Sequence, residues 1–139
     1  MSESEFAAVA VGTVHSPLVD PSAAPKQGDE GAPEATIMFA DRFREALDGI
    51  DPGDEVLVLT WLDRGDRDVL RVHPRGDTDR PEMGVFATRS PDRPNPIGLH
   101  RVGVVAVDGC EVRVRDLEAV DGTPVLDVKP ILGGDAADR

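Results

Sequence analysis

The longest apolar run in the chain extends from Glu55 to Leu62, where Val-Leu-Val-Leu-Thr-Trp-Leu follows the glutamate. An almost unbroken run of this length predicts a strand that is buried on both faces. Trp61, the sole tryptophan, lies near the end of the run, and its indole N–H will need a hydrogen-bond partner there.

A second pattern predicts a β-hairpin. Leu99 to Val107 and Cys110 to Asp116 flank the dipeptide Asp108-Gly109, which is the strongest short hairpin signal in the sequence. In the second arm a cysteine and two valines alternate with a glutamate and two arginines. We therefore expect a half-buried strand with a charged outer face there.

Shorter apolar segments predict three more strands, at Phe6 to Val14, Ala35 to Phe39 and Val69 to His73. In the first of them Val9, Val11 and Thr13 fall on one face. One helix is expected, from Asp41 to Leu47, because its apolar residues recur at i, i+4 spacing.

These elements indicate an all-β domain, mostly an antiparallel β-barrel with one short helix. Six or seven short strands with many turns are typical of a closed or nearly closed barrel, and the 12 prolines and 14 glycines favour turns over long helices. A chain of 139 residues fits one domain. We expect this domain to cover residues 1–132 and residues 133–139 to form a flexible tail.

Residues 90–96 contain three X-Pro bonds within seven positions. Each proline fixes its own φ and pushes the preceding residue toward extended geometry, so the segment is expected to be a stiff loop. Two guanidinium groups and a carboxamide lie on it, from Arg89, Arg93 and Asn95. The residues alone leave two interpretations open, which are a preorganised ligand site and a surface connection with solvated arginines.

Three motifs carry a resemblance to a known family. Residues 84–98 read Gly-Val-Phe-Ala-Thr-Arg-Ser-Pro-Asp-Arg-Pro-Asn-Pro-Ile-Gly, and residues 121–130 read Asp-Gly-Thr-Pro-Val-Leu-Asp-Val-Lys-Pro. Residues 11–17 and the tripeptide Pro25-Lys26-Gln27 form the third. In this order, over roughly residues 9–132, they resemble the TsaA/TrmO-like family of S-adenosylmethionine-dependent tRNA methyltransferases, which implies a small β-barrel and that cofactor.

The resemblance also implies the positions of the functional residues and the assembly. Family members act on the exocyclic nitrogen of threonylcarbamoyl-adenosine beside the tRNA anticodon, and the family pattern suggests a homodimer with each cofactor site close to the subunit interface. The implied cofactor contacts are Pro25, Lys26, Gln27, Asp63, Arg64, Arg89, Leu99, Asp121, Gly122, Thr123 and Pro124.

The chemistry of the cofactor assigns roles to some of these side chains. A methionine carboxylate suits an arginine fork, whereas the sulfonium should avoid one, so Arg89 is expected at the carboxylate or a hydroxyl. Arg93 and Asn95 are expected to hold the loop together or to face substrate. Since the acceptor nitrogen carries an acyl group, a carboxylate could remove its proton, and Asp127 is the candidate.

Asp127 and Lys129 have more than one interpretation. In a strand they share a face, and they could form an ion pair that supports the site, a solvated outer surface, or a pair that assists proton transfer. Val125 would fall on the same face, so the pattern does not decide which face is buried.

Other catalytic patterns are missing from the sequence. No GxGxxG follows a strand, which does not support a Rossmann-type methyltransferase. His15, His73 and His100 lie far apart without zinc spacing, so no metal is expected and a structural role is the usual one for such histidines. Cys110 is expected in the core rather than as a nucleophile. No apolar run approaches a membrane span and no secretory signal is visible, so a cytoplasmic, membrane-free protein is expected.

Charge bears on the acceptor. The formal net charge is −12, although residues 64–101 hold eight arginines against six acids, which makes this window +2 and the rest −14. The better-known bacterial relatives carry a further C-terminal domain implicated in tRNA binding, and this sequence ends just after the expected barrel. Weak, salt-sensitive tRNA binding is therefore expected.

Two other functions stay open. One is methylation of a small-molecule metabolite on the same scaffold, and the other is a cofactor-binding module that has lost catalysis. The sequence also departs from the family at Leu62-Asp63, where members commonly carry an aromatic residue and a histidine. A carboxylate in place of a neutral imidazole would alter a cofactor or substrate contact.

Overall fold

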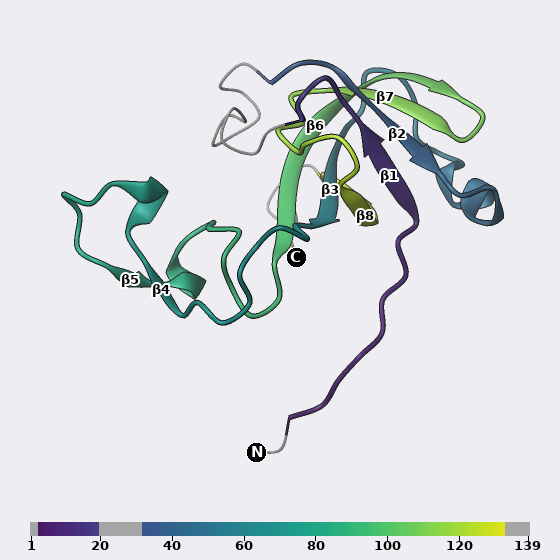
Figure 1. The fold of residues 1–139 in the computed structure, drawn as a ribbon. Coiled ribbons are helices and arrows are strands. Elements are labelled where there is room, and N and C mark those ends of the chain that lie inside the picture. Colours follow the sequence, from purple (N-terminus) through teal and green to yellow (C-terminus); the bar gives the residue numbers. More distant parts are fainter. Residues whose placement is uncertain (1–2, 20–31, 133–139) are drawn as a thin grey trace.

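The computed structural model describes residues 3–19 and 32–132, and six of its strands close into an antiparallel barrel (Figure 1). Around the barrel, neighbouring strands follow the order β1-β2-β7-β6-β3-β8. Their bounds are β1 Gly12–His15, β2 Ala35–Phe39, β3 Glu55–Trp61, β6 Ile97–Asp108, β7 Glu111–Arg115 and β8 Pro124–Pro130. The expected all-β barrel is confirmed. The expected tail at 133–139 lies outside the described residues.

β3 alternates between the two faces of the barrel wall, so the prediction of a strand buried on both faces is wrong. Val56, Val58 and Thr60 are buried, whereas the three residues between and after them are only half-buried. A closed barrel gives each strand one face toward the core and one toward the outside. The apolar residues of the outer set are Leu57, Leu59 and Trp61.

An irregularity in β8 resolves the ambiguous pattern of its sequence. Leu59 of β3 pairs with Asp127, but the next residue, Thr60, pairs with Val125, so Leu126 is an extra residue in β8. Because of this bulge, the alternation of core-facing and outward-facing residues in β8 shifts by one position at Leu126. Val125 therefore faces the core beside Thr60, while Asp127 lies on the outer face beside Leu59.

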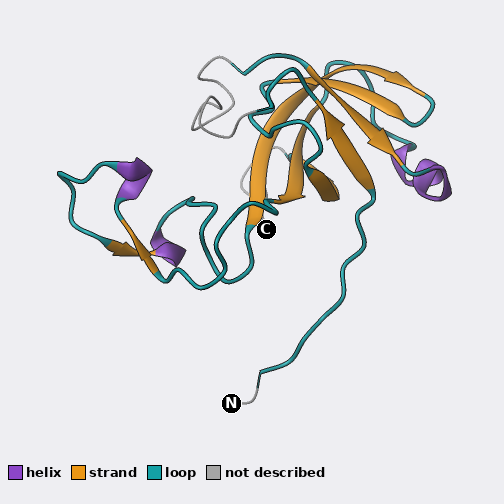
Figure 2. Cartoon of the chain, in the orientation of Figure 1, coloured by secondary structure: helices purple, strands orange, loops and turns teal. Residues whose placement is uncertain are grey.

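The first strand begins later than expected. β1 starts at Gly12 rather than at Phe6, and residues 3–11 form no strand. Gly12 is paired with Phe39, the last residue of β2, so residues before it have no partner strand along that edge. Figure 2 shows this part of the chain extending away from the barrel, and the Phe6 side chain is 92% exposed. The inward residues of β1 are Gly12 and Val14, not the predicted set of Val9, Val11 and Thr13.

The predicted helix forms with the expected bounds, as the 3-10 helix η3 (Asp41–Leu47). Leu47 is buried in the core, and Phe43 is half-buried under the Arg42 guanidinium, which lies 4.3 Å from its ring centroid. Two single-turn 3-10 helices were not expected, η4 (Pro74–Gly76) and η5 (Val85–Ala87).

The predicted hairpin joins β6 and β7. Asp108 pairs with Glu111 across a turn made by Gly109, which has a φ of 61°, and Cys110. Val112 and Val114 are buried, and the residues that alternate with them, Glu111, Arg113 and Arg115, are exposed, as expected. Cys110 is half-buried in the turn, with its Sγ 3.8 Å from Asp41 Oδ1, so its predicted place in the core is wrong.

Residues 62–96, here called the excursion, leave the barrel between β3 and β6 and lie to one side of it in Figure 1. The excursion contains a two-stranded sheet of β4 (Arg71–Val72) and β5 (Met83–Gly84), in which the strand expected at residues 69–73 is reduced to two residues. Among the described residues, no helix is long and apolar enough to cross a membrane.

Candidate functional site

Arg93 holds the proline-rich loop together from within. Its Nη1 donates to the carbonyl oxygens of Thr88 and Ser90 at 2.9 and 3.0 Å, and its Nη2 donates to the Val85 oxygen at 2.6 Å. The guanidinium is partly buried by these contacts. Of the two roles expected for Arg93, the structure shows loop support, because its donors bind the backbone of residues 85–90.

Asn95 is fixed by an arginine that the sequence analysis did not single out. Arg67 donates from Nε to the Pro94 oxygen at 2.7 Å and from Nη2 to Asn95 Oδ1 at 3.1 Å, and its guanidinium lies 5.2 Å from the Trp61 ring centroid. Asp92 accepts a further bond at 2.8 Å from the Asp66 amide. These contacts join the two ends of the excursion. Arg67 was missed because it lies in an Arg/Asp-rich run that reads as solvated loop.

Arg89 is different from Arg93 although only four residues separate them. Its side chain is exposed and makes no hydrogen bond or ion pair with the residues that the structure describes. Within the part of the chain that the structure describes, the rigid loop therefore leaves the Arg89 guanidinium without a partner and uses that of Arg93 internally.

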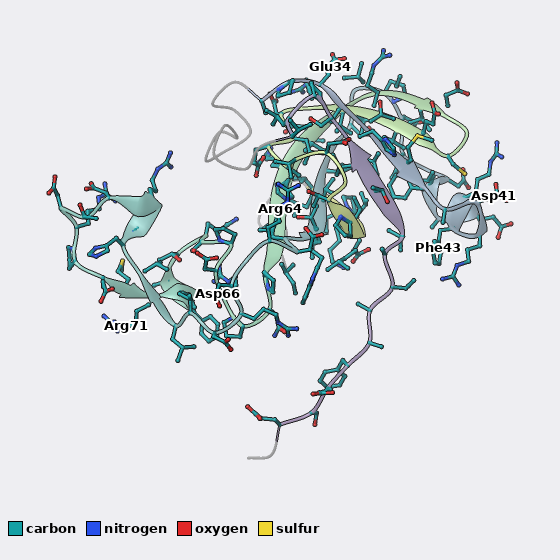
Figure 3. All side chains as sticks on the ribbon, viewed as in Figure 1. Glu34, Asp41, Phe43, Arg64, Asp66 and Arg71 are labelled. Atoms are coloured by element: carbon teal, nitrogen blue, oxygen red, sulfur yellow. The ribbon has the colours of Figure 1, made fainter. Side chains whose placement is uncertain are left out.

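Several predicted contacts meet at one end of the barrel. β3 runs antiparallel to β6 and β8, so the end of β3 lies beside the starts of the other two strands. Asp63 and Arg64 follow β3, Leu99 lies near the start of β6, and residues 121–124 lead into β8. In Figure 3, Arg64 lies next to the barrel, where the excursion begins. Arg64 Nη1 is 3.5 Å from the Val19 oxygen. Pro25, Lys26 and Gln27 lie outside the described residues.

The turn at residues 121–124 is tied to the end of β1. The Asp121 amide donates to the Leu18 carbonyl oxygen at 2.6 Å, and the Asp121 side-chain Oδ1 accepts from the Ser16 amide at 3.0 Å. Gly122, with a φ of 85°, donates to the Val14 oxygen at 2.7 Å. The turn is thereby fixed against the strand that leads to residues 20–31.

The predicted base and its lysine lie on the outer face of the barrel. Asp127 Oδ2 is 3.0 Å from Lys129 Nζ, and the two side chains are 50% and 59% exposed. Asp127 Oδ1 also accepts from the Val128 amide at 2.9 Å. Across the strands, Asp127 pairs with Leu59, which pairs with Leu99, so the carboxylate and Leu99 share one face with a single strand between them. The pair is an exposed surface ion pair, worth little as such for stability.

A buried polar cluster inside the same end of the barrel was missed by the sequence analysis. His100 is 4% exposed, its Nε2 lies 2.6 Å from Thr60 Oγ1, and its Nδ1 lies 2.6 Å from Glu118 Oε1. Gly98 makes room for it, because a Cβ there would lie 2.7 Å from Nε2 and would also contact the threonine hydroxyl. The available signal was the alternation of Gly98, His100 and Val102 along one face of a strand.

A cleft of about 710 Å³ lies at the opposite end of the barrel, and none of the predicted contacts that the structure describes lines it. It is an open surface hollow lined in part by Asp48, Asp54 and the Glu55–Arg101 pair. The bond from Arg101, at 2.8 Å, holds the pKa of the Glu55 carboxyl below its usual range. We favour the end with Asp63, Leu99 and the 121–124 turn because described residues from three separate sequence motifs meet there, namely residues 14–16, 97–98 and 121–124.

The fold and this site define a class, namely a small antiparallel barrel that carries a rigid proline-rich loop at one end. The chain matches the tRNA-methyltransferase O N-terminal domain over residues 13–135 and belongs to that family. The resemblance of its motifs to TsaA/TrmO-like proteins is thus confirmed.

Curated relatives and a solved structure extend this result. A "probable S-adenosyl-L-methionine-binding protein" of Methanothermobacter thermautotrophicus is 44% identical, with 94% of this chain and 93% of the relative covered. An "S-adenosyl-L-methionine-binding protein" of Archaeoglobus fulgidus is 43% identical, and the match covers 86% of this chain and 84% of the relative. The crystal structure of TrmO from Pseudomonas aeruginosa matches with a TM-score of 0.77 and 27% identity, covering 97% of this chain. This chain spans 60% of that TrmO chain.

The different contacts of Arg93 and Arg89 predict different effects of the same substitution. Arg93→Ala removes three hydrogen bonds inside the loop and should lower the free energy of unfolding by about 1–3 kcal/mol. Arg89→Ala, in the same loop, should change it by less than about 0.5 kcal/mol. Urea unfolding of both variants checks this. Equal losses would contradict the internal role of Arg93.

Proposed function

We propose that this chain is an S-adenosylmethionine-dependent methyltransferase. The observation that carries the proposal is the meeting of Asp63, Arg64, Leu99 and the 121–124 turn at one end of the barrel, beside the proline-rich loop. The names of the two archaeal relatives support the cofactor, and the matching family supports the reaction. With this function we also propose a cytoplasmic location.

Side chains at this end of the barrel and on the proline-rich loop are of the kinds that such a cofactor needs. Arg89, which has no partner among the described residues, offers its guanidinium to a carboxylate, and the 41% exposed Leu99 offers apolar cover to a nucleoside. When bound, S-adenosylmethionine supplies a methyl group already activated on a sulfonium. The protein then needs chiefly to position donor and acceptor and to receive a proton.

A calorimetric titration tests the cofactor and its site together. S-adenosylmethionine and S-adenosylhomocysteine should bind the wild type at micromolar level, and Arg89→Ala should weaken binding by at least about tenfold, since it removes a charge-assisted contact. Arg113→Ala is the matched control, because Arg113 is an exposed arginine on β7 that pairs with Glu34. Absence of binding to the wild type would refute the cofactor, and equal loss in both variants would refute the site.

For the acceptor, we propose the exocyclic nitrogen of threonylcarbamoyl-adenosine beside the tRNA anticodon, with Asp127 as the base. The description of the matching family supports a tRNA acceptor. Asp127 shares the outer face with Leu99, and its Oδ2 is engaged only by the exposed Lys129 among the described residues, so a solvent-side substrate can reach it. Lys129 supports the carboxylate in this scheme.

Asp127→Asn removes the base and keeps the shape of the side chain. Single-turnover methyl transfer to threonylcarbamoylated tRNA should fall by about 10²- to 10⁴-fold while cofactor binding stays within about twofold. Glu111→Gln, at an exposed carboxylate on β7, is the control. Full turnover by Asp127→Asn would eliminate the proposed base.

A second candidate is a small-molecule acceptor, favoured by the net charge of −12, which opposes strong binding to tRNA. Turnover on an acyl-amine or thiol metabolite without RNA would support it. Tight cofactor binding with no methyl transfer to any acceptor would instead indicate a module that has lost catalysis.

We further propose a homodimer, in which a second copy of the chain covers apolar side chains close to the site. Exposed large apolar residues gather on the excursion and the start of β6, and isolated proteins rarely leave such residues uncovered together. They are Leu70, Met83, Phe86, Ile97 and Leu99, with exposed fractions of 65%, 41%, 84%, 45% and 41%.

Phe86→Asp should convert the dimer to a monomer, because it places a charge in the apolar contact. Light scattering with size-exclusion chromatography measures the mass. Phe6→Asp, at a 92% exposed phenylalanine in the N-terminal segment, should leave the dimer intact. A monomeric wild type at high concentration would contradict the proposal.

A further inference from the structure

We propose that the buried chain Thr60–His100–Glu118 fixes the geometry of the candidate cofactor site, with His100 as a positioning residue. This inference rests on the proposed function. It concerns three side chains that neither the sequence motifs nor the proposed chemistry uses.

The polar chain is continuous and shielded from solvent. Thr60 is 0% exposed and His100 is 4% exposed, and the Glu118 side chain is 18% exposed. The two hydrogen bonds of the imidazole are both 2.6 Å long. Bonds this short, in a site of low polarity, restrict the three side chains strongly.

The chemistry of the partners sets the direction of each bond. An ionised Glu118 carboxylate only accepts, so His100 Nδ1 carries a proton and donates to it. In the neutral imidazole Nε2 is then the acceptor, and the Thr60 hydroxyl donates. The Thr60 hydroxyl, both imidazole nitrogens and Glu118 Oε1 are thus engaged, and the structure has no buried side-chain nitrogen or oxygen without a partner among the described residues.

A contribution to stability does not by itself explain why the polar side chains of Thr60, His100 and Glu118 are buried here. The neighbouring inward positions, Val58 and Val102, are valines, and an apolar residue at 100 would fit their pattern. Buried polar groups contribute little net stability compared with apolar replacements, but they define one geometry because each bond has a direction. The absence of a side chain at Gly98 lets the imidazole reach across to Thr60.

The three residues of the polar chain are close in sequence to three segments that are predicted to contact the cofactor. Thr60 precedes Asp63 by three residues, His100 follows Leu99 directly, and Glu118 precedes Asp121 by three. The first two members are held by strand ladders, whereas residues 116–123 belong to no strand. Glu118 is therefore the point at which the polar chain attaches the segment that leads into the 121–124 turn to β3 and β6.

His100 acts through other residues rather than on a substrate. Both the imidazole and the Thr60 hydroxyl point into the packed barrel, whereas Asp127 and Leu99 lie on the outer face. The polar chain thus holds the three segments in register without touching what binds to them.

The test compares loss and retention of the Glu118 acceptor. Glu118→Ala should speed amide hydrogen exchange at residues 119–123 by about tenfold or more and weaken S-adenosylmethionine binding by a similar factor, as expected when a supporting bond is lost. Glu118→Gln, which keeps an acceptor oxygen, should restore most of both. Thr60→Val, which is nearly isosteric, should show a smaller change in the same direction.

Val112→Ala is the control for general destabilisation, since Val112 is buried in β7, which does not pair with β3 or β8. At a matched loss of melting temperature it should leave local exchange at 119–123 and cofactor affinity within about threefold. Changes that follow melting temperature in all variants would overturn the positioning role. Hydrogen exchange is measured without cofactor, so it decides this inference even if the wild type binds no S-adenosylmethionine and the proposed function fails.

Discussion

Closure of the barrel gives each strand an inner and an outer face, and most of the structure follows from this constraint. β3 lies between β6 and β8 and sets the parity of both. Residues opposite each other in an antiparallel ladder lie on the same face, so the inward Thr60 places Gly98 and Val125 inward as well. The outward Leu59 places Leu99 and Asp127 outside, which gathers candidate site residues on one surface.

The bulge at Leu126 is needed because apolar and charged residues do not alternate regularly along β8: Val125 and Asp127 would share a face in a regular strand. Without the extra residue, burying Val125 would place Asp127 inside the barrel, where an unpaired carboxylate is very costly. With it, Val125 packs in the core and the Asp127–Lys129 pair lies in solvent. One irregularity thus reconciles the core with the outer surface of the site.

The sequence predicted what local chemistry determines and missed what tertiary contacts determine. The hairpin at Asp108-Gly109 and the bounds of η3 were predicted, because turn residues and spacing suffice for them. The alternation of β3 was not visible in an unbroken apolar run, and β1 was extended too far because its partner strand ends at Phe39. The alternation of residues 98–102 signals that His100 faces inward, but its partners could not be predicted, since Thr60 and Glu118 lie 40 and 18 residues away.

Prolines in the loop restrict its backbone, but they do not decide which arginine is presented to a ligand. It depends on which backbone carbonyl oxygens each guanidinium can contact. Arg93 lies where its fork can meet three carbonyl oxygens of residues 85–90, so its donors are used within the loop, whereas Arg89 has no such acceptors among the described residues. A loop that uses one guanidinium for its own rigidity presents the other from an ordered backbone, so on binding only the Arg89 side chain has to be ordered. The rigidity of the loop and the exposure of Arg89 therefore go together in this structure.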